Sequence, residues 1–423
     1  MKLTRTQWIT LLGLGTLLVV SYLGWRYAQT YEMRLFALDA RTGHVKWSTP
    51  LKLDFAPSAA NGRVFVYSME PLSRESRKHL QKSAYGKEVV RTAKLCAFDS
   101  ATGQQLWQYV FDPQEFELAG SSLANPPVAS EKWVAASLND HTLAVLDASS
   151  GALLWRFDQA LTSTNGQVFT FAGDRLILFS ENGDGSGYSA QALDAQTGTP
   201  VWKASLADLN PVALIIDKPA LTKSDQLAFM SSNDWVQAFD LSSGELQFEV
   251  KANSEQLQVV ANILYINTGN KLLAMETTTG APLWTFAVSE QDPYLFGLRT
   301  ADQVIYIASI FGDQNEDKGA WLHALNASDG RELWRKQLDQ SIRGESSLIT
   351  VRDPVANSEA FFITIELEDY TLTAFSAVDG AERWRFPLHQ DNSPAIEGNL
   401  IFVVDRAPRW QNWLAHINPA WHE

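Results

Sequence analysis

The chain has 423 residues, of which 45% are hydrophobic, so it is long enough for one large or two ordinary domains with a buried core. Its net charge of −14 argues against a nucleic-acid-binding surface, which needs a basic face. The single cysteine, Cys96, excludes an intramolecular disulfide and a cysteine metal cluster.

The N-terminal residues predict a membrane anchor. Thr6 to Trp25 is a run without charge, and a helix of about 20 residues spans about 30 Å, the thickness of a bilayer's hydrocarbon core. Lys2 and Arg5 precede the run and favour a cytoplasmic N-terminus. We expect residues 1–33 to form a cytoplasmic tip, a transmembrane helix and a short spacer. A cleaved signal peptide is the alternative.

A ten-residue pattern occurs eight times after this segment. It first reads "LDARTGHVKW" and returns, for example, as "LDASSGALLW". Its glycines are Gly43, Gly103, Gly151, Gly198, Gly244, Gly280, Gly330 and Gly380. Four residues after each glycine stands an aromatic residue: Trp47, Trp107, Trp155, Trp202, Phe248, Trp284, Trp334 and Trp384. Four residues before it stand Asp39, Asp99, Asp147, Asp194, Asp240, Glu276, Asn326 and Ser376.

This pattern predicts a β-hairpin. Small and large residues alternate before the polar position, as they do along a strand with two different faces. An Asp or Asn side chain can accept bonds from backbone N–H groups of a turn, and glycine tolerates the positive φ that such turns require. A tryptophan can bury a large area between neighbouring sheets. We interpret the eight aromatic residues and the eight glycines as blade-docking residues.

Apolar runs before seven of these hairpins predict further strands. Examples are "GRVFVYS" (residues 62–68) and "DRLILFS" (residues 174–180), each entered from a polar turn. Four strands in each unit of 40 to 50 residues are typical of a propeller blade. The first hairpin has no strand pair ahead of it, and "SPAIEGNLIFVVD" (residues 393–405) has no full hairpin after it. The sequence therefore predicts an all-β fold in which residues 34–423 form an eight-bladed propeller of four-stranded antiparallel blades, with one blade shared by both ends.

The repeat resembles that of a known superfamily. "AFDSATGQQLW" and "ALDAQTGTPVW" are similar to the repeats of pyrroloquinoline-quinone-like (PQQ-like) β-propellers, and the eight copies look most like the group of the outer-membrane assembly factor BamB. The resemblance implies a non-enzymatic accessory subunit that binds protein partners through loops on one face. Together with the anchor, it implies a scaffold in the bacterial inner membrane with its propeller in the periplasm. BamB-like proteins carry a lipid on a cysteine, which has no counterpart near the start of this chain.

Two other functions remain open. A PQQ-dependent dehydrogenase would use a calcium ion held by Glu, Asn and Asp, and many members carry a pair of adjacent cysteines, which this chain lacks. A ligand- or glycan-binding propeller is the other alternative. The loops "DQNEDKG" (residues 313–319) and "NGDGSG" (residues 182–187) begin like calcium loops but lack the glutamate at position twelve. We predict no cofactor, no metal site and no catalytic residue.

An insertion in the second repeat predicts a partner-binding segment. Residues 71–92 lengthen the spacing between Trp47 and Trp107 and carry six basic residues against two glutamates. The basic residues are Arg74, Arg77, Lys78, Lys82, Lys87 and Arg91. On an acidic protein they favour an acidic partner or anionic lipid headgroups. A mobile charged loop without a partner is the simpler interpretation.

Overall fold

The structure is a computed structural model that describes residues 31–408 with several internal gaps. The gaps are residues 53–54, 79–90, 113–125, 138–141, 158–168, 182–187, 207–220, 224–225, 233–234, 255, 289–292, 312–319, 339–350, 367–369 and 390–392. The predicted membrane anchor lies in residues 1–30, outside the described part. Within the described part, no helix combines the length and the apolar character that crossing a bilayer requires.

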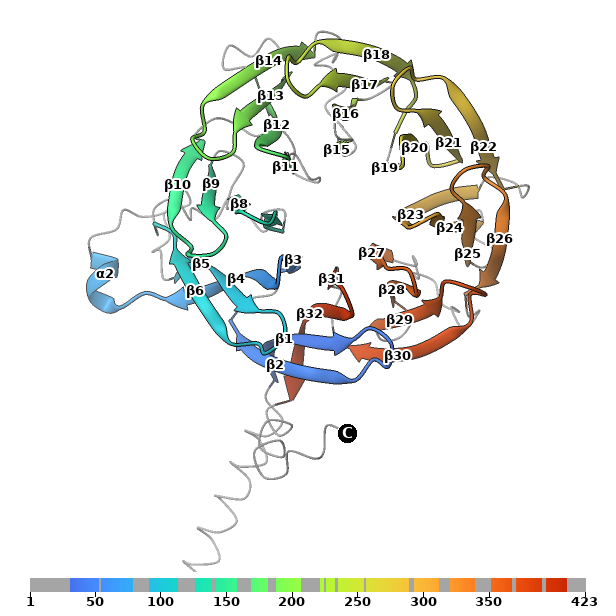
Figure 1. Ribbon diagram of the computed structural model, residues 1–423. Helices are drawn as coiled ribbons and strands as arrows, with labels where there is room; N and C mark the ends of the chain where they lie inside the picture. The colour runs from blue at the N-terminus through green and yellow to red at the C-terminus, as the bar shows by residue number, and fades with distance from the viewer. Residues whose placement is uncertain are drawn as a thin grey trace, which may run out of the picture.

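Eight four-stranded sheets stand around a central axis (Figure 1). In four of them the strands, from the axis outward, are β3 (Ser58–Ala60), β4 (Arg63–Pro71), β5 (Arg91–Asp99), β6 (Gln105–Val110); β7 (Val128–Ala129), β8 (Trp133–Ser137), β9 (Leu143–Asp147), β10 (Leu153–Phe157); β11 (Phe169–Ala172), β12 (Arg175–Glu181), β13 (Tyr188–Asp194), β14 (Pro200–Leu206); and β15 (Leu221–Lys223), β16 (Leu227–Ser232), β17 (Trp235–Asp240), β18 (Leu246–Lys251). All neighbouring strands pair antiparallel.

The next three sheets follow the same order. They are β19 (Gln256–Val260), β20 (Ile263–Asn267), β21 (Lys271–Glu276), β22 (Pro282–Ala287); β23 (Pro293–Ala301), β24 (Val304–Phe311), β25 (Ala320–Asn326), β26 (Glu332–Gln337); and β27 (Val351–Ala356), β28 (Ala360–Glu366), β29 (Tyr370–Ser376), β30 (Glu382–Leu388). Each sheet is called a blade and is named here by its strands. The fold is therefore the predicted eight-bladed β-propeller of four-stranded antiparallel blades.

Both ends of the described chain build the eighth blade. Its strands, from the axis outward, are β31 (Ala395–Glu397), β32 (Leu400–Pro408), β1 (Tyr31–Asp39) and β2 (Val45–Leu51). β1 pairs with β32 along its whole length, from Tyr31 opposite Pro408 to Asp39 opposite Leu400. This composite blade confirms the predicted closure, because the last strand pair supplies the two inner strands that the first hairpin lacks.

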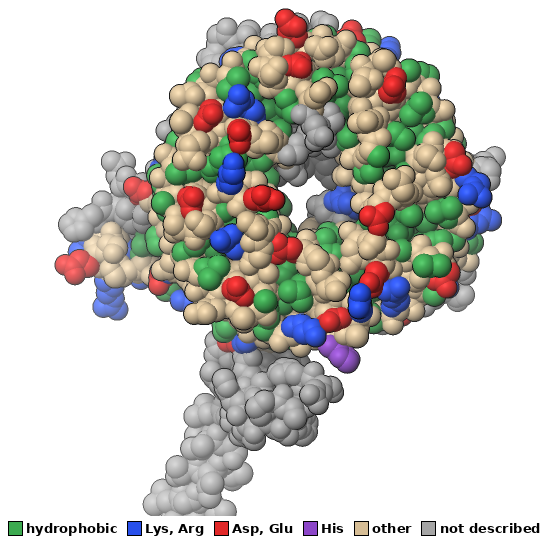
Figure 2. Space-filling view, viewed as in Figure 1, with side chains coloured by type: hydrophobic (Ala, Val, Ile, Leu, Met, Phe, Trp, Pro, Cys, Tyr) green, Lys and Arg blue, Asp and Glu red, His purple; other side chains and the backbone are tan. Residues whose placement is uncertain are grey.

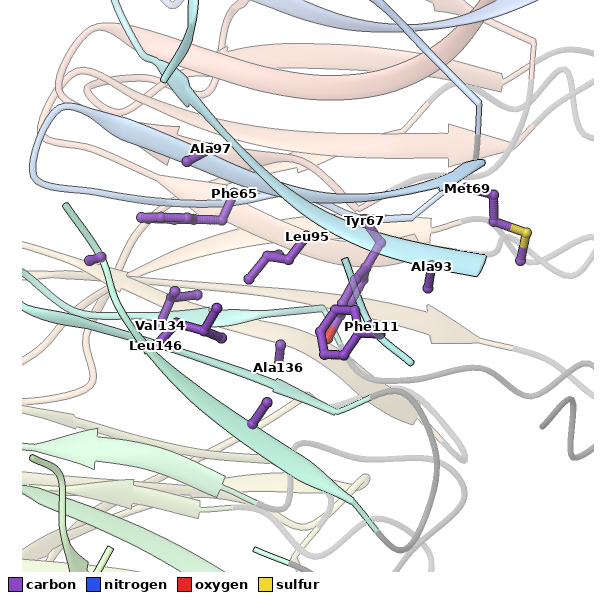
Figure 3. Close-up of a cluster of buried hydrophobic side chains, with 12 residues drawn as sticks. Phe65, Tyr67, Met69, Ala93, Leu95, Ala97, Phe111, Val134, Ala136 and Leu146 are labelled. Atoms are coloured by element: carbon purple, nitrogen blue, oxygen red, sulfur yellow. The ribbon is translucent and has the colours of Figure 1, made fainter. Parts of the chain in front are cut away.

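The hydrophobic core lies between the blades. Figure 3 shows one of its clusters, in which Phe65, Tyr67 and Leu95 of the β3–β6 blade face Val134 and Leu146 of the β7–β10 blade. All five side chains are at most 1% exposed. The core is thus divided among the seams between blades, and each seam depends on two sheets that face each other.

The middle of the ring is hollowed, and acidic and basic side chains are interspersed over the face seen in Figure 2. The helix α2 (Arg74–Lys78) lies outside the ring, between β4 and β5 (Figure 1). It is the single helix that the described residues contain.

Candidate functional site

The repeated motif forms the turn between the third and the outer strand of each blade. In the first copy, Asp39 Oδ1 accepts the backbone N–H groups of Arg41 and Thr42 at 3.0 and 3.1 Å, and Gly43 has a φ of 73°. The turn that follows Asp240 is built in the same way. There, hydrogen bonds from the Ser242 hydroxyl and the Ser243 backbone lower the pKa of Asp240 to about 2, because they favour the charged carboxylate.

Each motif aromatic lies on the motif glycine of the next blade. A Cβ atom added to Gly103 would stand 2.5 Å from Trp47 Cε3, so no side chain fits there. The same contact occurs at all eight seams, with the nearest aromatic atom at 2.5 to 2.7 Å from such a Cβ. The pairs are Trp47–Gly103, Trp107–Gly151, Trp155–Gly198, Trp202–Gly244, Phe248–Gly280, Trp284–Gly330, Trp334–Gly380 and Trp384–Gly43. We call this packing the seam contact.

Seven seams add a hydrogen bond to this contact. The indole Nε1 of each motif tryptophan donates to a backbone carbonyl of the next blade's motif turn, at 2.9 to 3.2 Å. The acceptors, in the order of the tryptophans, are Ser100, Ala148, Ala195, Leu241, Ala327, Ala377 and Ala40. The bond from Trp384 to Ala40 closes the ring, since it joins the last full blade to the composite blade.

The seam between the β15–β18 and β19–β22 blades is different. Its aromatic residue is Phe248, which packs on Gly280 but has no N–H to donate. The adjoining turn begins with Glu276, whose carboxylate accepts the Thr279 hydroxyl at 2.6 Å. The one motif phenylalanine and the one motif glutamate therefore meet at the same seam.

The two faces of the ring carry different connections. The motif turns, such as residues 40–44, lie at one end of the strands, which we call the turn face. Tyr31 and Pro408 lie opposite each other at the other end, which we call the loop face. Pro71 and Arg91, where the basic insertion leaves and rejoins its blade, also lie opposite each other on the loop face.

The described part of the insertion is a short helix with exposed charges. Arg74 and Lys78 are exposed and stand one helical turn apart. Arg77 is half-buried, and its Nε donates to the Leu72 carbonyl at 3.1 Å. The predicted partner residues Lys82 and Lys87 lie outside the described residues, and Arg91 begins β5. Partner binding by this segment stays a prediction.

One group of three side chains, of which the serine and the histidine are buried, has the atom order of a hydrolytic triad. The Ser309 hydroxyl lies 2.8 Å from His323 Nε2, and His323 Nδ1 lies 2.7 Å from a carboxylate oxygen of Glu332. Ser309 is 0% exposed, and His323 is 2% exposed with its ring edge-on to Phe286 of the preceding blade. A substrate cannot reach a fully buried hydroxyl. We therefore interpret the group as a structural link, which joins β24, β25 and β26 by hydrogen bonds and contacts Phe286 across the seam.

His389 and Asp405 form a titratable pair near the loop face of the composite blade. The carboxylate of Asp405 accepts the backbone N–H of His389 at 2.9 Å and lies 3.0 Å from its Nδ1. Burial raises the pKa of Asp405, although its hydrogen bonds with His389 act in the opposite direction. Tyr31 packs edge-on against the His389 ring.

In the part of the chain that the structure describes, no three His, Cys, Asp or Glu side chains converge as metal ligands would. Both loops with calcium-like beginnings, residues 182–187 and 313–319, lie outside that part. Cys96 is buried in β5, and burial raises the pKa of its thiol to about 11, so it is not a reactive thiolate at neutral pH.

Sequence comparison places the chain among known proteins. The family described as "Outer membrane protein assembly factor BamB" matches residues 4–110, 91–259 and 297–407. Relatives of that name come from Moranella endobia, 24% identical over 329 residues with 72% of this chain and 74% of the relative covered, and from Yersinia pestis, 24% identical over 317 residues with 72% of each covered.

Comparison with solved structures supports the fold. A quinohemoprotein alcohol dehydrogenase from Pseudomonas putida HK5 superposes with a TM-score of 0.53 at 12% identity, covering 87% of this chain and 70% of that one. At this identity the likeness concerns the propeller alone. The family model matches well over half of the sequence, so this chain belongs to the outer membrane protein assembly factor BamB family.

Proposed function

We propose that the chain is a non-enzymatic scaffold, anchored in the bacterial inner membrane, whose propeller binds protein partners in the periplasm. Family membership supports this role, since the relatives are assembly factors by name. The single observation that carries it is the use of the repeated motif. All eight copies contact the next blade, so the chain's strongest sequence signal builds a rigid ring and not a reactive centre.

The anchor is the finer part of the proposal. The run from Thr6 to Trp25 has the length and apolar character of a membrane-spanning helix. Arg26 to Thr30 is all that separates the run from Tyr31, where β1 begins. A ring tethered so closely must work beside the membrane, as a subunit of a membrane complex does.

Purification of the complex tests this proposal. The tagged full chain is crosslinked in cells and isolated from detergent-solubilised membranes, and its companions are identified by mass spectrometry. We expect integral membrane proteins in stoichiometric amounts. A chain that elutes alone contradicts the scaffold role. Oxidation of alcohols by the chain, coupled to a dye in the presence of pyrroloquinoline quinone and Ca²⁺, would instead support the dehydrogenase alternative.

A variant without the anchor's membrane insertion distinguishes proteins that bind the propeller from proteins that merely share a detergent micelle with the chain. Replacing Leu14 and Leu17 with Arg places two charges in the middle of the apolar run, and each costs about 3 kcal/mol at the bilayer centre. We expect this variant to be released from the membrane by alkaline carbonate. Companions that still bind the released variant contact the propeller, whereas companions that are lost share only the membrane.

A further inference from the structure

We propose that the loop face of the propeller lies against the membrane and that α2 contacts anionic lipid headgroups there. This inference rests on the proposed membrane anchor and specifies what α2, the described helix of the basic insertion, binds. The sequence alone left two kinds of partner open, an acidic protein and an anionic lipid surface. The strand topology favours the lipid surface.

The direction of β1 determines which face is tethered. β1 starts at Tyr31 on the loop face and reaches the turn face at Asp39, eight residues later. At about 3.3 Å per residue, the turn face lies roughly 26 Å beyond the point where the anchor segment attaches. Five residues lie between Trp25 and Tyr31, and even a fully extended chain over these six residue steps spans only about 20 Å. The loop end of the composite blade therefore stays close to the bilayer surface.

The basic insertion belongs to the neighbouring blade and to the same face. The β3–β6 blade packs directly on the composite blade, since Trp47 of the composite blade lies on Gly103 and donates to the Ser100 carbonyl. Its insertion leaves the sheet at Pro71, on the loop face. α2 is thus carried outward from the ring one blade away from the tether (Figure 1).

The charge of α2 favours a contact with anionic lipid. Arg74 and Lys78 are exposed on α2, and Arg77 is held beside them by its bond to the Leu72 carbonyl. On the turn face, bases are paired with acids, as Lys46 is with Asp39 and Arg175 with Asp194. An anionic bilayer therefore attracts α2 over distances of about one Debye length.

Site-specific fluorescence in vesicles tests the arrangement. The full chain is reconstituted into vesicles of phosphatidylcholine with or without 30% phosphatidylglycerol, each containing a headgroup-attached quencher. In a Cys96→Ala background, a fluorophore is placed at Ser76→Cys on α2 or at Ala101→Cys in a motif turn. Both positions are exposed. We expect at least threefold stronger quenching at position 76 than at position 101, and a larger difference when phosphatidylglycerol is present.

Charge reversal tests the contact with headgroups. The double variant Arg74→Glu and Lys78→Glu should lose the part of the quenching at position 76 that depends on phosphatidylglycerol. Its control, Lys132→Glu and Arg331→Glu, changes the same charge at two exposed residues on the turn face, and the fluorophore at position 76 should then be quenched as in the parent.

Three results would overturn the inference. Equal or stronger quenching at position 101 means that the loop face does not lie against the bilayer. If quenching at position 76 changes neither with phosphatidylglycerol nor with charge reversal, α2 does not recognise anionic headgroups. A crosslinker at position 76 that captures a co-purified protein, with no quenching by lipid, assigns α2 to a protein partner. Extraction by alkaline carbonate reports on the anchor separately, so failure of the anchor is distinguishable from failure of this inference.

Discussion

The seven tryptophan seams and the Phe248 seam share one packing contact but differ in hydrogen bonding. All eight place an aromatic ring on a glycine that has no room for a Cβ atom. Seven of them also satisfy a backbone carbonyl with an indole N–H, as Trp334 does for Ala377. At the eighth, Phe248 supplies only the ring.

The difference shows that the seam contact and the indole hydrogen bond are separable. The ring on the glycine sets how closely two blades approach, and it occurs at every seam. The indole hydrogen bond is an addition of about 1 kcal/mol that one seam does without. We therefore expect the seam between the β15–β18 and β19–β22 blades to exchange its amide hydrogens fastest, because it lacks the indole hydrogen bond.

The largest effect is expected from opening the ring at its closing blade. Removing residues 393–423 deletes β31 and β32, so that β1 loses the partner it pairs with over its whole length. The buried residues Ile401 and Val403 leave the seam with the β27–β30 blade. We expect the truncated chain to lose its cooperative thermal transition in calorimetry. A soluble truncation that still melts cooperatively would show that the other seams hold an open ring together.

The next largest effect should come from a methyl group at a seam glycine. Gly330→Ala places a Cβ 2.5 Å from Trp284 in a backbone with a φ of 71°. We expect a loss of about 3 kcal/mol in unfolding free energy from strain and overpacking together. Gly398→Ala is the control, since its φ of 57° imposes similar strain but nothing lies within 4 Å of the added atom. Equal losses in the two variants, measured by denaturant titration, would refute the importance of the close approach.

These positions also show why the ring could be predicted from the sequence. Glycine at a fixed position indicates a turn with positive φ, and tryptophan at a fixed distance from it indicates a large buried contact. Their recurrence located all eight hairpins, and the unpaired strands at the two ends located the composite blade. Alanine also stands six residues before the glycine in seven of the eight copies. The reason is equally local, because Ala97 stands opposite Trp107 in the same blade and leaves room for its indole.

What could not be predicted depends on register between strands. Ser309, His323 and Glu332 come from β24, β25 and β26, and only the exact pairing brings their polar atoms together. A signal was available, since His323 stands seven residues before the motif glycine, where another copy has Leu273. The carbonyl that accepts each indole N–H could not be predicted for a different reason. Every residue has a backbone carbonyl, so the residue type does not show which one accepts.

Exchanging the aromatic residues of two seams tests the indole bond directly. Trp334→Phe leaves the Ala377 carbonyl without its indole donor, and we expect it to cost about 1 to 2 kcal/mol in unfolding free energy. Phe248→Trp should gain up to about 1 kcal/mol, because Ala238 opposite and Gly280 beneath resemble the surroundings of the tryptophans.

In Trp334→Phe and Phe248→Trp, the rate of amide hydrogen exchange should change together with the unfolding free energy. The β19–β22 blade should be protected in Phe248→Trp, and the β27–β30 blade should exchange faster in Trp334→Phe. A tryptophan at 248 that destabilises the ring would mean that this seam is shaped for phenylalanine.

The smallest effect should come from the charge of a motif turn. The pKa of Asp240 is about 2 in the folded chain against an ordinary value of 3.8, so its carboxylate stabilises the fold fully above pH 4. This contribution is lost as the pH falls from about 4 to about 2. Asp240→Asn should keep the turn, since Asn326 accepts the Ser328 backbone N–H at 2.9 Å in another copy, but it removes the titration. We therefore expect a shallower loss of melting temperature between pH 4 and pH 2 in the variant than in the parent chain. Parallel curves for the two proteins would mean that the Ser242 and Ser243 bonds hold the protonated acid as firmly as the carboxylate.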